Sequence, residues 1–133
     1  MRGPRILNLR LMPKHMEPAD GLHGRIFGFA MLSDDDGFAT TANIYVDRLS
    51  AVADGRKYRG GVVLGAMIAH EMGHLLLGVG SHSKMGLLTL PWGPKVLAAA
   101  DQGRLGFTKK ESRRLARAIE ARTRVADAVA LLQ

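Results

Sequence analysis

Residues 61–82 read GVVLGAMIAHEMGHLLLGVGSH, and this stretch holds the pattern that decides the fold. Residues 61–69 are apolar and contain no proline, and three leucines follow the second histidine, which predicts a helix through the core. Residues four apart lie on one helix face, so His70 and His74 can present two imidazole nitrogens to one metal ion. Glu71 lies beside them, where a carboxylate can act on a water molecule at the metal.

The third histidine of this stretch follows a break in the helix pattern. On a straight helix His82 would lie roughly 12 Å beyond His74 along the axis, too far to share the ion. We therefore expect Gly78 to end the helix in a left-handed cap, so that the chain turns back and His82 becomes the third ligand. Three imidazoles and a water molecule form the open tetrahedral set of a catalytic zinc, so the prediction is one Zn²⁺ per chain.

Two later carboxylates are alternative third ligands. Asp101 and Glu111 both follow the motif, and other zinc peptidases draw a carboxylate ligand from a later helix. Glu111 also has a structural explanation, because Thr108-Lys109-Lys110-Glu111 is a capping box that would begin the C-terminal helix. Asp101 therefore stays open as the alternative to His82.

The motif and its surroundings resemble a known class of enzymes. Residues 70–92 read HEMGHLLLGVGSHSKMGLLTLPW, with NIYVDRL at 43–49 before them and GRLGFT at 103–108 after them. This arrangement is similar to the zincin metallopeptidases, and more narrowly to a compact, metzincin-like group of bacterial zinc peptidases with HExxH-x7-H spacing. In that group the third histidine is followed by a serine, a Gly-Ile-Met-type turn and a tryptophan. The likeness extends from about Gly28 onward.

The resemblance implies a zincin fold in which His70, His74 and His82 bind zinc and Glu71 is the catalytic carboxylate. The common metzincin pattern has a glycine three residues and a histidine six residues after the second ligand, whereas here these residues come at 78 and 82. The methionine beneath the metal is replaced by Leu88 if residues 86–88 form the equivalent turn, although a methionine stands close by at position 85.

Length and composition limit the fold. The chain has 133 residues, of which 47% are hydrophobic, enough for a single domain over residues 1–133. It contains no cysteine, so a thiolate metal site and a disulfide framework are both excluded, and histidine and carboxylate must bind the metal. The N-terminal MRGPRILNLRLMP has arginines and prolines where a signal peptide needs an apolar stretch, which predicts a cytoplasmic protein. A true start further upstream would instead predict export.

The remaining patterns predict a small α+β domain, with a mixed sheet packed on the motif helix and a long C-terminal helix. Residues 6–11 alternate apolar and polar side chains, and 25–32 and 38–46 are two further strands joined by an Asp- and Gly-rich turn. In zincins an edge strand over the cleft pairs with extended peptide, and Phe27 to Met31 resembles that strand. A short helix is expected from Lys95 to Gln102.

The C-terminal helix, from Lys109 almost to the end, has an apolar stripe that we expect to pack on the domain. The stripe consists of Leu115, Ala118, Ile119, Val125, Val129 and Leu132. Its other side is basic, with seven Lys or Arg against two Glu between residues 109 and 124, in a chain of net charge +7. Aromatic residues do not interleave with these charges, so a solvated face is favoured over a nucleic-acid surface.

These features predict a zinc metallopeptidase, a hydrolase that acts on a peptide or protein substrate. Zinc held by neutral imidazoles lowers the pKa of its water to around 7, and Glu71 takes the proton as general base. One alternative is a non-catalytic or regulatory zincin-like protein, which resembles the peptidase-like partners of bacterial repressors. Another is a basic module that binds an anion or nucleic acid and carries a structural zinc, although such a site does not need Glu71.

Overall fold

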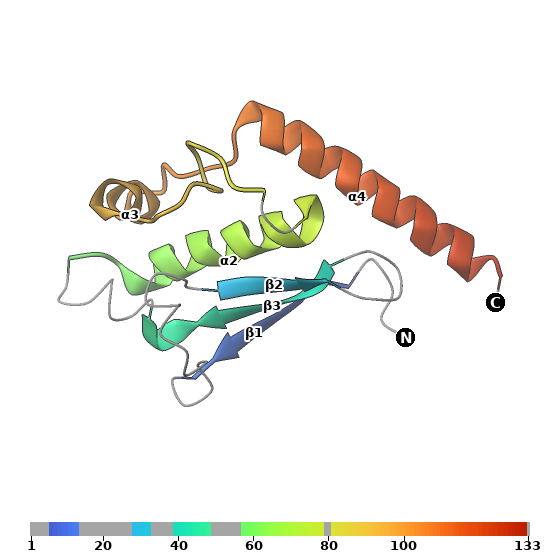
Figure 1. Ribbon diagram of the computed structural model, residues 1–133, viewed down its shortest axis with the longest axis horizontal. Helices are drawn as coiled ribbons and strands as arrows, with labels where there is room; N and C mark the ends of the chain where they lie inside the picture. Colours follow the sequence, from blue (N-terminus) through green and yellow to red (C-terminus); the bar gives the residue numbers. More distant parts are fainter. Residues whose placement is uncertain (1–5, 14–27, 33–38, 49–56, 79–80, 133) are drawn as a thin grey trace.

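The computed structural model describes residues 6–13, 28–32, 39–48, 57–78 and 81–132. The described part is a mixed α+β structure, as the sequence predicts (Figure 1). Its elements are β1 (Asn8–Met12), β2 (Gly28–Leu32), β3 (Ala39–Tyr45), α2 (Gly60–Leu77), α3 (Pro94–Asp101) and α4 (Lys109–Ala130). Every predicted strand and helix is present, with ends that differ by a few residues. The expected turn between β2 and β3 lies outside the described residues, as does Phe27.

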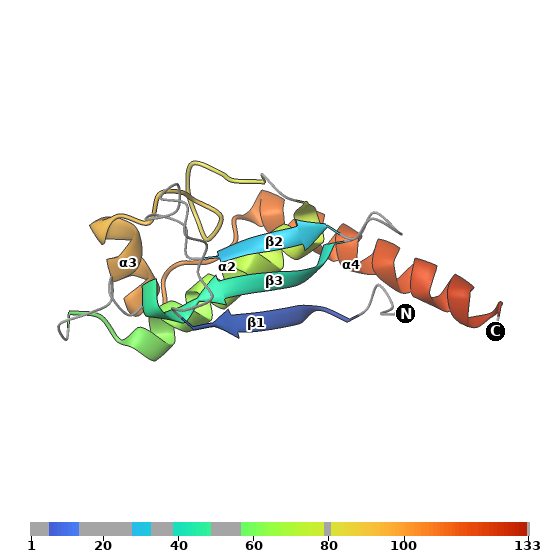
Figure 2. The same cartoon turned by 60° about the horizontal axis from the view of Figure 1, so that its bottom comes forward.

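The sheet has the strand order β1-β3-β2. β1 pairs with β3 in parallel, and β2 pairs with β3 in the antiparallel direction. Among the described strands β2 therefore lies at an edge, and its direction is opposite to that of the other two. Figures 1 and 2 show the strands as one layer, with α2 lying across one face of it.

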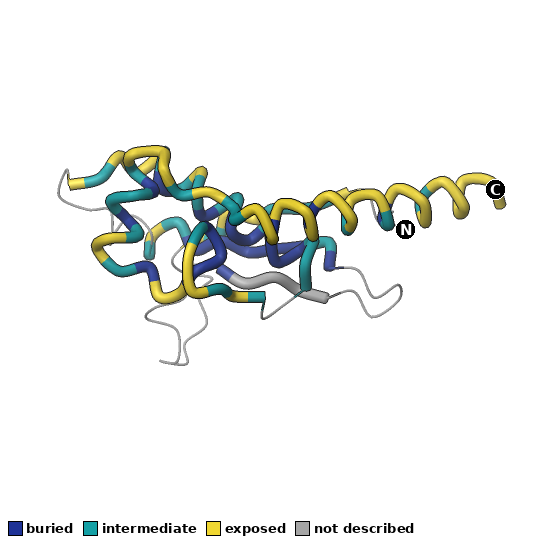
Figure 3. Tube along the Cα trace, turned by 90° about the horizontal axis from the view of Figure 1, so that it is seen from above, coloured by how far each residue is buried: buried dark blue, intermediate teal, exposed yellow. Residues whose placement is uncertain are grey.

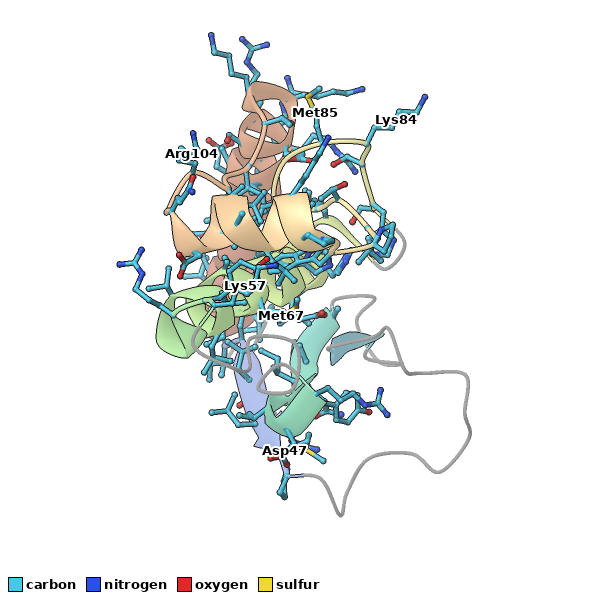
Figure 4. All side chains as sticks on the ribbon, turned by 90° about the vertical axis from the view of Figure 1, so that its left-hand side faces the viewer. Asp47, Lys57, Met67, Lys84, Met85 and Arg104 are labelled. Atoms are coloured by element: carbon cyan, nitrogen blue, oxygen red, sulfur yellow. The ribbon has the colours of Figure 1, made fainter. Side chains whose placement is uncertain are left out.

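Alternate residues of β3 point toward α2 and fill the space between helix and sheet. Ile44 packs with Val63 and Met67 in the main core, and Ala42 packs with Leu75 near the other end of the helix. Figure 4 shows Met67 between α2 and the strands. All these side chains are nearly inaccessible. Burial of the larger ones, Ile44, Val63, Met67 and Leu75, is worth about 1.5–3 kcal/mol each, which holds α2 and its motif firmly on the sheet.

Both ends of α2 are determined by residues outside its apolar run. At the start, the Arg59 backbone N–H donates to Asp101 Oδ1 at 2.6 Å, which takes the place of a side-chain cap within the helix. At the end, Gly78 has a positive φ of 98°, as predicted, but its ψ is 154° rather than that of a left-handed helix. Only glycine readily adopts this combination. The chain therefore leaves the helix in an extended direction and not through the left-handed cap that the sequence suggested.

The apolar residues of α2 also give it the length and hydropathy of a membrane-spanning helix. Core helices of soluble proteins share these properties, so length and hydropathy do not distinguish a core helix from a membrane-spanning one. Among the described helices α2 alone has them.

α4 only partly follows the packing that its apolar stripe predicts. Leu115 is buried, and the guanidinium of the buried Arg122 donates to the carbonyls of Ala39, at 2.8 Å, and Leu75. Beyond this point the helix projects from the domain, and Figure 3 shows exposed residues along most of its C-terminal half. The expected burial is wrong for Ile119, Val125, Val129 and Leu132, which are 51%, 40%, 43% and 88% exposed. Length explains the last three, since 22 residues span about 33 Å and reach beyond the end of α2. Ile119 precedes the buried Arg122 and instead lies on the exposed side of the helix.

Candidate metal centre

Two histidines on the same face of α2 form the buried part of the centre. His70 and His74 are 2% and 6% exposed, and their Nε2 atoms lie 3.0 Å apart. This is the i, i+4 pairing that the sequence predicts. Burial lowers the pKa of His70, and it lowers that of His74 to about 4, helped by the charges of His70 and His82. Both imidazoles are therefore neutral at pH 7, as metal ligands must be.

Hydrogen bonds at the opposite ring nitrogens assign the tautomers of these two histidines. His70 Nδ1 lies 2.7 Å from the Leu87 carbonyl oxygen, which can only accept, so Nδ1 carries the hydrogen. His74 Nδ1 lies 3.4 Å from Ser81 Oγ, and that hydroxyl donates its own hydrogen to the Gly78 carbonyl at 2.5 Å. His74 Nδ1 is therefore also a donor. In both rings Nε2 is then left as a bare lone pair, which is the arrangement found in metal-binding histidines whose other nitrogen donates a hydrogen bond.

The two bare nitrogens explain what the pair can hold. Lone pairs that face each other at 3.0 Å repel unless a proton or a metal cation lies between them. Nitrogens bound to one tetrahedral zinc at about 2.0–2.1 Å are themselves about 3.3 Å apart. His70 and His74 thus have nearly the separation that a shared metal ion requires, and the donor set fits such an ion.

His82 joins the pair from the segment that follows α2. The ligand nitrogens of His70, His74 and His82 all lie within 4.8 Å of one another. The His82 ring is stacked near His70, with centroids 5.7 Å apart, and meets His74 edge-on at 4.6 Å. It is the exposed member of the three. Three histidines are therefore close enough to bind a metal ion, and solvent reaches the cluster from the His82 side.

The loop from Ser81 to Trp92 forms the wall beneath the histidines. The fully buried Leu88 packs against α2 at Gly73, where an added Cβ would lie 2.8 Å from the leucine side chain. Trp92 donates to Thr89 O at 3.0 Å and meets the His70 ring edge-on at 5.8 Å. Leu88 is thus buried against α2, whereas Met85 is 69% exposed (Figure 4).

Glu71 points from α2 toward the start of β2. An added Cβ at Gly28 would lie 2.9 Å from Glu71 Oε1, so the carboxyl group lies directly against the backbone of the edge strand. Glu71 is 3% exposed, and within the described part of the chain its Oε2 has no hydrogen-bond partner. Burial raises the pKa of Glu71 to about 7. A buried carboxyl group with one free oxygen and this pKa is suited to taking up and releasing a proton.

The structure places the two alternative ligands elsewhere. Asp101 pairs with Arg59 at the N-terminal end of α2, about 16 Å along the helix from His70. That contact, led by the hydrogen bond from the Arg59 backbone, lowers the pKa of the Asp101 carboxyl. Glu111 forms the predicted capping box with Thr108. Neither carboxylate belongs to the histidine cluster.

Sequence reasoning did not identify the residues that support these side chains. Gly28 and Gly73 make room for Glu71 and Leu88, and Ser81 and the Leu87 carbonyl orient the two buried histidines. Only Gly28 left a signal, because a glycine within a strand pattern marks a close approach of another group.

Comparisons of the chain with protein-family models, with curated proteins and with solved structures found no significant match.

Proposed function

We propose that the protein is a zinc-dependent peptide hydrolase of the zincin type, with His70, His74 and His82 as the metal ligands and Glu71 as the general base. The observation that carries this proposal is the pair of bare Nε2 lone pairs 3.0 Å apart on the same helix as a buried carboxyl group. The first feature calls for a cation, and the second supplies a base next to it.

The ligand set favours a catalytic zinc over a structural one. Structural zinc is enclosed by four protein ligands, whereas catalytic zinc has three and keeps one position open. The cluster contains three histidines in the described part of the chain, and its third member is exposed. A zinc ion held there supplies Lewis acidity, which acidifies a water molecule and polarises a carbonyl group.

The protein groups supply the proton transfers. Glu71 takes a proton from the attacking water and passes it to the departing amine. Burial by itself raises the pKa of Glu71 to about 7, and the charge of a bound metal ion would lower it and keep the carboxylate ionised as a base. Burial lowers the pKa of His70, and its Nε2 lone pair is the one assigned to the metal, so this imidazole does not compete for the proton.

An edge strand beside the base supports a peptide as substrate. Within the described residues β2 pairs on one side only, with β3, and its first residue lies against Glu71. An extended peptide can add to such an edge by main-chain hydrogen bonds, which do not depend on its sequence. This arrangement brings a backbone carbonyl of the peptide close to the base.

Glu71→Gln tests the proposal. Glutamine keeps the shape of the side chain but cannot accept the proton, so we expect hydrolysis of a quenched fluorescent peptide library to fall by about 10² to 10⁴. Zinc content, measured by plasma mass spectrometry, should stay at one ion per chain. Glu120→Gln, at an exposed position of α4, is the matched control and should retain full activity. Equal activity of the Glu71 variant at equal zinc would contradict the proposal, and zinc binding without hydrolysis by the wild type would favour a regulatory protein.

A further inference from the structure

His82 differs from the other two histidines in the way it is held. The rings of His70 and His74 are each oriented by a hydrogen bond at Nδ1. The His82 ring has no such partner among the residues that the structure describes, and its contacts are with the other two rings. Its position therefore depends on the backbone of the loop on which it lies, which is held by Ser81 on one side, through the Gly78 carbonyl, and by Ser83 on the other.

Ser83 is fixed by both its backbone and its side chain. Its N–H donates to the Leu88 carbonyl at 3.1 Å, which closes the loop on itself. Its hydroxyl oxygen lies 2.7 Å from both the Met85 carbonyl and Glu111 Oε1. A hydroxyl has one hydrogen to share between these acceptors, and the ionised carboxylate is the stronger one. Ser83 thereby connects the loop that carries His82 to the first turn of α4.

Glu111 is well placed to hold this connection rigidly. It is 4% exposed, and its second oxygen, Oε2, accepts from the Thr108 backbone N–H at 2.7 Å. Burial by itself would raise the pKa of Glu111, but the hydrogen bonds from Ser83 and Thr108 outweigh it and lower the pKa, so the carboxylate is charged. One carboxylate thus joins the helix start to the loop by two charge-assisted hydrogen bonds.

A second link fastens the same loop to the segment before α4. The Leu87 N–H donates to the Gly106 carbonyl at 2.8 Å, and the Leu87 carbonyl accepts from His70. Gly86 permits this approach, since an added Cβ would lie 2.9 Å from Gly106 O. The far part of the loop is therefore anchored by its backbone, whereas the part next to His82 is anchored by the Ser83 to Glu111 hydrogen bond.

We propose that Glu111 is a positioning residue for the metal centre, which acts through Ser83 to hold His82 in place as the third ligand. Glu111, which the sequence suggests as a possible metal ligand, therefore contacts the loop that carries the ligand His82 and not the metal. This inference rests on the metal site of the proposed function, but not on peptide hydrolysis. Without the hydrogen bond between Ser83 and Glu111, the His82 imidazole can still bind the metal ion, but the ion must then order the loop, which weakens the affinity for the metal.

The capping box allows this role to be separated from simple stabilisation of α4. Ser83→Ala removes the link and leaves the cap, whereas Thr108→Ala removes the cap hydroxyl, which accepts from Glu111 N–H at 3.2 Å, and leaves the link. We expect Ser83→Ala to raise the Kd for Zn²⁺, measured by competition with a chromogenic chelator, about tenfold. Its metal-free Tm should stay near that of the wild type. Thr108→Ala should lower the Tm by about 3–5 °C with an unchanged Kd.

Two further variants test whether the effect runs through Glu111. Ser83→Thr keeps the hydroxyl and should restore the wild-type Kd and the visible absorption of the Co²⁺-loaded protein, which Ser83→Ala should alter. In a Glu111→Gln background, Ser83→Ala should add little further loss of affinity, because both changes weaken one link.

Several outcomes would overturn the inference. They are an unchanged Kd in Ser83→Ala, additive losses in the double variant, or a Kd that simply follows the Tm in all variants. A wild type that binds no Zn²⁺ would overturn it together with the proposed function. A wild type that binds Zn²⁺ and shows the expected pattern but hydrolyses no peptide would leave the inference standing and refute only the hydrolase.

Discussion

Replacing Gly28 with alanine should reduce the proposed hydrolysis without removing the metal, because this glycine makes room for Glu71, the proposed general base. A methyl group at Gly28 would lie 2.9 Å from Glu71 Oε1 and 2.5 Å from the Asn43 carbonyl oxygen. Ordinary contacts of this kind begin at 3.4 Å, so the two distances are short by about 0.5 Å and about 0.9 Å. Either the carboxyl group must retreat or β2 must move away from β3.

The size of the effect follows from these displacements. A misplacement of about 1 Å in a catalytic group can cost on the order of 10² in rate, so a shift of about 0.5 Å should lower kcat by about tenfold. Overpacking against the strand backbone should also cost about 1–3 kcal/mol of folding free energy. The three atoms nearest to that methyl group belong to Asn43 and Glu71 and not to a histidine, so the zinc content should not change.

The assay compares kcat, zinc content and the urea unfolding midpoint of Gly28→Ala with those of Gly65→Ala. Gly65 lies on the exposed side of α2, and an added Cβ there would meet nothing within 4 Å. That control should keep full activity and gain up to about 1 kcal/mol of stability from helix propensity. Wild-type kcat in Gly28→Ala at equal zinc would refute the reasoning. So would a fall in kcat that matches a fall in bound zinc, since the metal would then be the group affected.

Two predictions concern stability. Arg122→Met should lower the free energy of unfolding by about 2–4 kcal/mol, because it leaves two buried carbonyl oxygens without their donor. Arg124→Met, at an exposed position of the same helix, is the control and should change the free energy of unfolding by less than about 0.5 kcal/mol. Equal urea midpoints for the two variants would contradict this prediction. In metal-free Glu71→Gln, stability should fall as the pH drops from 6.5 toward 4, because the unfolded chain protonates His74 and the folded chain, with a pKa of about 4, does not. The stability of the metal-free wild type should decline less steeply over this range, because the pKa of Glu71 near 7 lets the folded state take up a proton between pH 7 and 4.5. Identical slopes of stability against pH in the wild type and Glu71→Gln would refute the raised pKa of Glu71.

Features that depend on neighbours along the chain could be derived from the sequence. The helix that carries His70 and His74 follows from an apolar run without proline, and their pairing follows from the helical repeat alone. The capping box of Thr108 and Glu111 is equally local, and the structure contains it as predicted. The return of the chain at Gly78 was also foreseeable, because a straight helix would have carried His82 away from the other two histidines.

Features that join distant segments were decided only by the tertiary structure. The hydrogen bond from His70 reaches Leu87, and the carboxyl group of Glu71 lies against Gly28, which is distant in sequence, so no local pattern could show these partners. Val129 is exposed because α4 extends past the ends of α2 and the sheet, and the apolar pattern of α4 alone cannot predict where those elements end. Helical periodicity thus determined which residues can share a face. The packing of strand, loop and helix around that face decided which lone pairs stay bare, and so where a cation can bind.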